Sequence, residues 1–139
     1  MTLQRELFAA DAPAIPGLLL VPDAVTEWLR ATGIATGVLT LFCRHTSAGL
    51  LITENASPAV PRDLLRWLAH AAPEDPGYEH ADEGPDDMPA HIRAVITGNS
   101  LTVPVAGGRV MLGTWQGIFL AEHRDAPHRR NVVAHVIGD

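Results

Sequence analysis

The feature of this sequence that most constrains its fold is a succession of short strand patterns in the C-terminal third. These apolar runs cover residues 101–105, 109–112, 117–123 and 131–137. Short turns separate the first two, with Gly107-Gly108 between them, and strands joined in this way pair with antiparallel neighbours. We therefore expect an α+β domain with a mostly antiparallel, sandwich-like β-sheet flanked by about three helices.

The N-terminal half adds further strands, at residues 3–9, 15–21 and 37–43. A helix is expected at 23–32, because Val25, Trp28 and Leu29 form an apolar stripe. The apolar residues between Val60 and Ala71 recur at helical spacing and predict a second helix. A third helix is expected to start with a capping Asp87 and to end just before Gly98.

Length and composition indicate one domain spanning residues 1–139. With 47% hydrophobic and 19% charged residues, the chain can build a core without disulfides or a structural metal, so a bound metal would be functional. The net charge of −6 argues against nucleic acid and anionic membranes, which attract basic surfaces. Small molecules and other proteins remain as partners.

No targeting or membrane segment is expected. The start of the chain lacks a continuous apolar run, and the apolar stretch at 15–21 is short and contains Pro16 and Gly17. The one cysteine, Cys43, cannot form an internal disulfide and is expected to be a buried, unreactive core residue. These observations indicate a reducing, cytoplasmic location.

The segment 73–91 is the first candidate for a site, because it contains seven carboxylates and two histidines, His80 and His91, but no lysine or arginine. Such a segment attracts cations, and imidazole with carboxylate is a common ligand set for divalent metals. His45, at the end of a strand, could supply a further ligand. No local pair is expected to have the i, i+4 geometry of a metalloprotease helix, and a solvated acidic loop is the alternative interpretation.

The run His45-Thr46-Ser47-Ala48-Gly49 offers hydroxyl groups and small residues that could surround an anion. The run Gly98-Asn99-Ser100 is a second candidate for an anion contact. Ordinary turn chemistry is the alternative for both.

Five ordered motifs resemble the signature blocks of the YjbQ-like family, and the match spans residues 40–137. The blocks are His45-Thr46-Ser47-Ala48, Thr53-Glu54-Asn55-Ala56, Tyr78-Glu79-His80, Asp86-Asp87-Met88-Pro89-Ala90-His91-Ile92 and Gly113-Thr114-Trp115-Gln116-Gly117-Ile118. The resemblance implies a sandwich-like α+β fold that assembles as a homotrimer with sites near subunit boundaries. It also implies a secondary thiamine-phosphate synthase activity, which couples an aminopyrimidine diphosphate to a thiazole phosphate and releases pyrophosphate.

The resemblance also implies a set of functional residues. They are His45, Asn55, Asp63, His80, His91, Trp115, Gln116 and Glu122. Within this set we expect His45, His80 and His91 to converge on a divalent metal, zinc or magnesium. His45, His91, Asn55, Asp63 and Glu122 are the catalytic candidates.

The leading hypothesis is an enzyme for a small phosphorylated substrate, with thiamine-phosphate synthesis as its best-defined version. Thr46, Ser47, Ser100, Trp115 and Gln116 are the substrate-binding candidates, and Glu54, Glu83 and Asp87 could help to hold the cation. Because the acidic segment repels a diphosphate, an arginine from a neighbouring subunit could assist. The candidates are Arg109, Arg124, Arg129 and Arg130. A metal-dependent hydrolase and a non-enzymatic trimeric binding protein are the alternatives.

Overall fold

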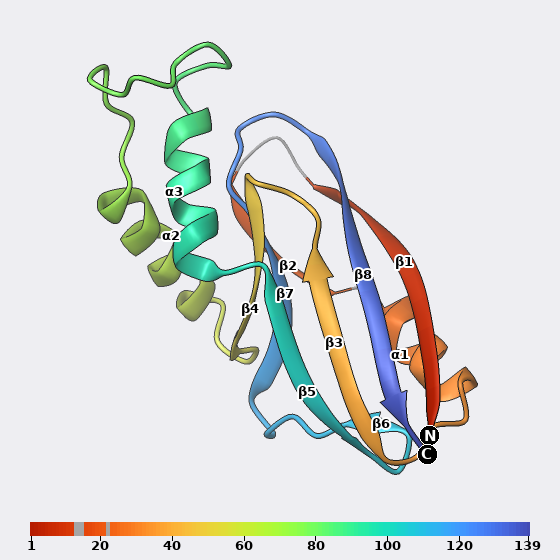
Figure 1. Ribbon diagram of the computed structural model, residues 1–139. Helices are drawn as coiled ribbons and strands as arrows, with labels where there is room; N and C mark the ends of the chain where they lie inside the picture. Colours follow the sequence, from red (N-terminus) through yellow and green to blue (C-terminus); the bar gives the residue numbers. More distant parts are fainter. Residues whose placement is uncertain (13–15, 22) are drawn as a thin grey trace.

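The computed structural model describes residues 1–12, 16–21 and 23–139, which form two antiparallel sheets and three helices (Figure 1). The larger sheet has the strand order β1 (Thr2–Ala12), β8 (His128–Gly138), β3 (Gly37–Cys43), β5 (Ser100–Ala106) and β6 (Arg109–Val110). The smaller sheet has the order β2 (Gly17–Leu20), β7 (Gln116–Glu122) and β4 (Ala48–Glu54). The helices are α1 (Asp23–Ala31), α2 (Ala59–Ala71) and α3 (Asp87–Thr97). The expected α+β class with antiparallel sheets is confirmed.

The main core lies between the two sheets and is closed by α1. Residues that alternate along β3 and β8, such as Leu39, Leu41 and Val136, are at most 1% exposed. They pack with Leu50 of β4 and Leu29 of α1 in one cluster. Burying a side chain of this size stabilises the fold by about 1.5 to 3 kcal/mol, so this cluster holds the sheets together.

Helices α2 and α3 lie together at one side of the molecule, beside β4 (Figure 1). The C-terminal end of α3 is attached to β4, because the backbone N–H of Leu50 donates to the carbonyl of Gly98 over 3.0 Å. Gly49 permits this approach, since a Cβ there would overlap the Gly98 carbonyl and the Thr97 hydroxyl. The attachment fixes the direction of α3 and therefore the position of its N-terminal end.

Three expectations differ from the observed elements. Strand β4 was missed, because its residues are not buried in alternation but in two consecutive groups. Asp87 was expected to cap α3, but it is the first helical residue and the Asp86 cap position makes no side-chain capping bond. The expected strand at 15–21 begins at Ile15, which lies outside the described residues, and the observed strand is Gly17–Leu20.

The outer face of the larger sheet is unusually apolar. Cross-strand partners place Leu3, Ile137 and Val38 in one row and Leu7, Val133 and Phe42 in another. Five of these six side chains are at least 42% exposed, and all six lie on the face opposite the core. His135 lies between the two rows, and its Nε2 is the one buried side-chain polar atom without a hydrogen-bond partner among the described residues.

The exposure of two single residues bears on the sequence analysis. Cys43 is buried, as predicted, and burial raises the pKa of its thiol. Trp115 is 65% exposed, so within one chain it does not fill the core. Among the described residues, no helix combines the length and the apolar character needed to cross a membrane.

Candidate metal centre

The N-terminal end of α3 carries two side chains of the centre, and the preceding loop carries the third. Asp87 and His91 are four residues apart on the helix and therefore project from the same face. His80 reaches the same carboxylate oxygen from the loop. Its Nε2 lies 2.8 Å from Asp87 Oδ2, and His91 Nε2 lies 3.0 Å from that atom. The expectation that no local pair has i, i+4 geometry was wrong for Asp87 and His91.

The hydrogen bonds of His91 fix which of its ring nitrogens carries a lone pair. Nδ1 lies 2.8 Å from the backbone carbonyl of Thr46, which can only accept, so Nδ1–H is the donor. In the neutral ring the lone pair of Nε2 then points at the Asp87 carboxylate, and two acceptors at this distance repel each other. A positive charge between them, either a second proton or a metal ion, would remove the repulsion.

The spacing of the three groups fits a divalent ion. One donor atom from each of His80, Asp87 and His91 can be chosen so that all lie within 4.8 Å of one another. Two donors bound to one zinc-like ion stand about 3.0 to 3.4 Å apart when each bond is about 2.1 Å long, which is close to the observed contacts. A histidine that ligates a metal also usually donates its other N–H to a carbonyl or carboxylate, as His91 does here.

Arg124 holds the carboxylate of Asp87 from the opposite side. Its Nη1 donates to Asp87 Oδ1 over 2.7 Å and its Nε donates to Asp86 Oδ2 over 2.9 Å. Asp87 is 1% exposed, and burial opposes its ionisation. The hydrogen bond with His80 and the charges of His91 and Arg124 outweigh burial and lower the pKa of Asp87. Asp87 is therefore a carboxylate with Oδ2 directed at the two histidines.

The donor set indicates which metals fit. Two imidazoles and one carboxylate are typical of zinc and of manganese, iron or cobalt. Magnesium prefers oxygen ligands in an octahedral arrangement, so the residues fit it less well. Three protein ligands leave positions open for water or a substrate.

His45 is not one of the three converging groups. Its Nε2 accepts a hydrogen bond of 2.7 Å from the backbone N–H of Asn131, so the neutral ring carries its proton on Nδ1. Burial and the charge of Arg130 lower the pKa of His45, which favours this neutral form. His45 instead lines a pocket of about 660 Å³ together with Thr46, Asn99 and His91. His91 thus borders both the pocket and the candidate metal centre.

Two predicted site residues belong to a buried structural network. Glu122 is fully buried and forms two bonds of 2.6 Å with Arg130, whose Nη2 also donates to the hydroxyl of Ser47. These contacts occupy both carboxylate oxygens. In the chain as described, Arg124 and Arg130 are engaged inside their own subunit, so the expectation that they reach across an interface does not fit.

The remaining predicted residues are not brought to the metal centre within one chain. Asp63 lies on an exposed part of α2, and Ser100 is exposed at the start of β5. Asn55 and Gln116 lie at the end of the β4–β7 pair opposite Glu122. A strand of this length separates its ends by roughly 20 Å, so Asn55, Gln116 and the adjacent Trp115 are remote from His91.

Sequence reasoning did not identify the supporting contacts from Arg124 and Thr46. Arg124 lies 37 residues beyond Asp87, and Thr46 lies 45 residues before His91. No local pattern marks either partner. In the sequence, only the adjacent carboxylates Asp86 and Asp87 at the start of a helix indicate that a cationic side chain lies nearby to balance their charge.

Comparison with known proteins identifies the family. The family model described as "UPF0047 protein YjbQ-like" matches residues 9–139. A UPF0047 protein of Synechocystis sp. is 53% identical over 112 residues, which cover 80% of this chain and 76% of that protein. The UPF0047 protein YjbQ of Salmonella typhimurium is 41% identical over the full length of both chains.

Solved structures agree with this assignment. A YjbQ/UPF0047 family protein from Clostridium acetobutylicum has a TM-score of 0.86 and 32% identity, and the alignment covers 95% of this chain and 99% of that one. The chain therefore belongs to the YjbQ-like UPF0047 family. The names of these relatives state no activity, so they add no support for thiamine-phosphate synthesis.

Proposed function

We propose that this YjbQ-like protein binds a divalent metal ion through His80, Asp87 and His91 and acts on a small anionic substrate in the adjoining pocket. The observation that supports this most is the contact between His91 Nε2 and Asp87 Oδ2 at 3.0 Å, while His91 Nδ1 is committed to the Thr46 carbonyl. A single cation would satisfy this contact, and His80 Nε2 lies 2.8 Å from the same carboxylate oxygen, close enough to join it as a ligand.

Charge balance favours an anionic substrate. Asp86 and Asp87 are bound by Arg124, so one of these two negative charges is offset inside the protein. A divalent ion would then leave the centre positive, although the acidic segment around it is negative. When bound, such an ion polarises a phosphoryl or carbonyl oxygen, or lowers the pKa of a bound water.

The pocket residues suggest how a substrate is oriented. Thr46 and Asn99 supply polar groups, whereas Ala48, Ala94 and Val95 supply apolar surface. His45 would donate from Nδ1–H, because its Nε2 already accepts from Asn131. We infer a substrate with an anionic end near His91 and a small apolar part against α3.

Within this class, hydrolysis fits a single chain better than the synthase reaction. The residues that line the pocket include no lysine or arginine. A departing diphosphate needs more positive charge than one metal ion provides, unless another subunit contributes it. Thiamine-phosphate synthesis therefore stays the second proposal, and it requires a cationic residue from a partner subunit.

Metal binding can be tested with one ligand and one matched control. His80 is 46% exposed, so His80→Ala should fold normally. We expect the variant to bind zinc at least tenfold more weakly than the parent protein in calorimetry after EDTA treatment and dialysis. His70→Ala, on the exposed surface of α2, should bind zinc like the parent. Equal zinc affinity in the parent and both variants would refute the site.

Activity is tested separately. The zinc-, manganese- and magnesium-loaded protein would be assayed with p-nitrophenyl phosphate, and with the aminopyrimidine diphosphate together with the thiazole phosphate. Release of p-nitrophenol that is lost in His91→Ala supports the hydrolase, and pyrophosphate release supports the synthase. Metal binding without turnover of either substrate set would count for the non-enzymatic binding protein.

We also propose that the outer face of the larger sheet is the contact between subunits of a homotrimer. Each of the two rows contains at least two large apolar side chains that are exposed, and clusters of exposed apolar side chains often mark an interface. His135 lies between the rows, with Arg5 and Thr40 as its cross-strand neighbours. The number of three comes from the family resemblance.

A further inference from the structure

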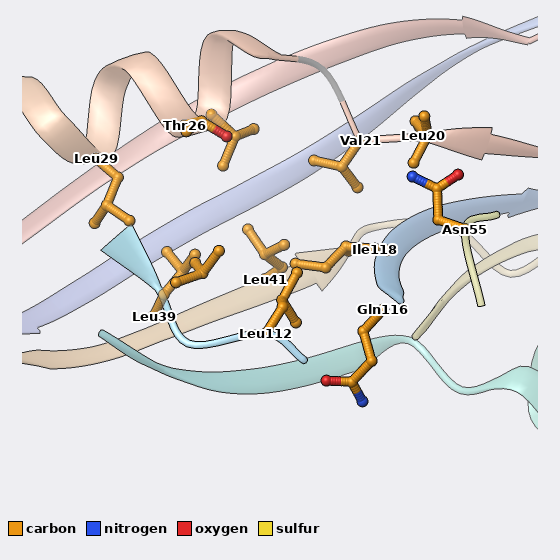
Figure 2. A pocket seen from close by; sticks show the side chains of 13 residues that line it. Leu20, Val21, Thr26, Leu29, Leu39, Leu41, Asn55, Leu112, Gln116 and Ile118 are labelled. Atoms are coloured by element: carbon orange, nitrogen blue, oxygen red, sulfur yellow. The ribbon is translucent and has the colours of Figure 1, made fainter. Parts of the chain in front are cut away.

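A second cavity lies away from the metal centre, between α1 and the two sheets. It has a volume of about 220 Å³. Figure 2 shows that Leu29 and Thr26 of α1 border it on one side and Leu39 and Leu41 of β3 on the other. Leu29, Leu39 and Leu41 are at most 1% exposed, so the cavity reaches the core. The proposed function uses none of these residues.

The size of the cavity limits its occupant. A dry apolar cavity of about 150 Å³ holds benzene, which has six non-hydrogen atoms. By proportion, this cavity accommodates on the order of nine such atoms. Because the cavity is partly open to solvent, this limit applies to the part of the occupant that enters it, and that part is smaller than a nucleotide or a typical drug molecule.

The lining determines the chemistry of the occupant. The thirteen lining residues, all within the described part of the chain, include no charged side chain. A charged ligand would lose its hydration there without gaining an ion pair, so a neutral molecule is favoured. Most of the wall is aliphatic, which suits a flat or compact apolar body.

Two exposed residues with amide groups border the cavity, and Figure 2 shows the Asn55 amide beside Leu20 and the Gln116 amide turned away from the leucines. The Gln116 side chain accepts a hydrogen bond of 2.7 Å from the backbone N–H of Gly113, which fixes its carbonyl oxygen and leaves its NH₂ group to donate. Asn55 lies against buried Gly117, where an added Cβ would come within 2.8 Å of the Asn55 side chain. The cavity therefore combines an apolar interior with the donor and acceptor of one amide, that of Asn55, at its rim.

We propose that this cavity is a binding site for a neutral, mostly apolar small molecule with one amide-like hydrogen-bonding end. Asn55 binds that end, and the leucines of α1 and β3 line the space for the apolar body. Asn55 was singled out in the sequence by the family motifs, but the structure separates it from the candidate metal centre.

The probe for this site is benzamide, which has nine non-hydrogen atoms, and its charged isostere is benzoate. Titration followed by protein NMR should give saturable benzamide binding with a dissociation constant on the order of 1 mM or tighter. Benzoate should bind at least tenfold more weakly. Absence of saturable benzamide binding, or equal binding of benzoate, would overturn the proposal.

Variants locate the binding. Thr26 is exposed on α1 and borders the cavity, so Thr26→Phe should occlude it and weaken benzamide binding at least tenfold. Glu27→Phe adds the same ring at the neighbouring exposed position, which does not line the cavity, and should leave binding unchanged. Asn55→Ala should reduce the preference for benzamide over toluene. If Thr26→Phe and Glu27→Phe weakened benzamide binding equally, benzamide would bind outside the cavity and the proposal would be wrong. The same conclusion would follow if a second chain occupied the cavity and excluded benzamide from it.

Discussion

Replacement of Arg124 by alanine tests whether the acidic start of α3 depends on one buried cation. Arg124 is 16% exposed and contacts Asp87, which is 1% exposed, and Asp86, which is 16% exposed. Removal of one partner of a buried pair costs about 3 to 5 kcal/mol, but the partly solvated Asp86 contact contributes about 1 kcal/mol or less. We therefore expect Arg124→Ala to lower the free energy of unfolding by about 3 kcal/mol.

Urea denaturation at pH 7 measures this change. With a slope of about 2 kcal/mol per molar, the midpoint should fall by about 1.5 M. Both proteins must be measured in EDTA and at one protein concentration, because bound metal and self-association also stabilise the folded state. Arg62→Ala, an exposed change on α2, should alter the free energy of unfolding by no more than about 0.5 kcal/mol.

The pH dependence gives a second check. Burial opposes ionisation of Asp86 and Asp87, but their bonding partners lower both pKa values below the ordinary 3.8. A carboxylate with a lowered pKa stabilises the fold above its unfolded pKa, and this contribution is lost as the pH falls through the folded pKa. The effect of Arg124→Ala should stay constant from pH 7 to pH 5 and shrink below about pH 4. A loss under 1 kcal/mol at pH 7, or one that matches Arg62→Ala, would refute the argument.

Three further predictions concern other parts of the molecule. Light scattering at micromolar concentration should give the mass of three chains, and Phe42→Glu, which places a charge on the proposed contact face, should weaken assembly; a mass near one chain would exclude the trimer. Burial and the charge of Arg93 lower the pKa of His123 to about 4, so its ring protons should not titrate by NMR between pH 7 and pH 5. The unfolded state, in which the pKa is near 6.5, binds this proton at a higher pH than the folded state does. A fall in pH from 7 to 5 should therefore lower the free energy of unfolding by roughly 2 kcal/mol through His123. A titration midpoint near 6.5 in the folded protein would contradict this. Cys43 should react with a thiol reagent only after unfolding, so rapid labelling of the native protein would show that it is accessible.

Local patterns in the sequence were sufficient for several elements. The apolar run at 37–43 coincides with β3, and the predicted helix at 60–71 is α2, Ala59–Ala71. Strand and helix periodicity are properties of consecutive residues, so they can be read without knowledge of the fold. The acidic segment with His80 and His91 was recognised for the same reason, since its composition is local.

Only the tertiary structure determined which of these residues meet. Four residues that match the family motifs lie in three different places. His45 lines the pocket beside the candidate metal centre, Asn55 and Gln116 border the second cavity, and Glu122 forms a buried ion pair with Arg130. Their positions depend on the register of β4 with β7 and of β3 with β8, and register is set by the packing of whole sheets. The bond from His91 to the Thr46 carbonyl likewise exists only because α3 is anchored on β4 at Gly49. Local sequence patterns therefore predicted most of the elements and the residue types of the candidate metal centre, and sheet packing determined which residues meet.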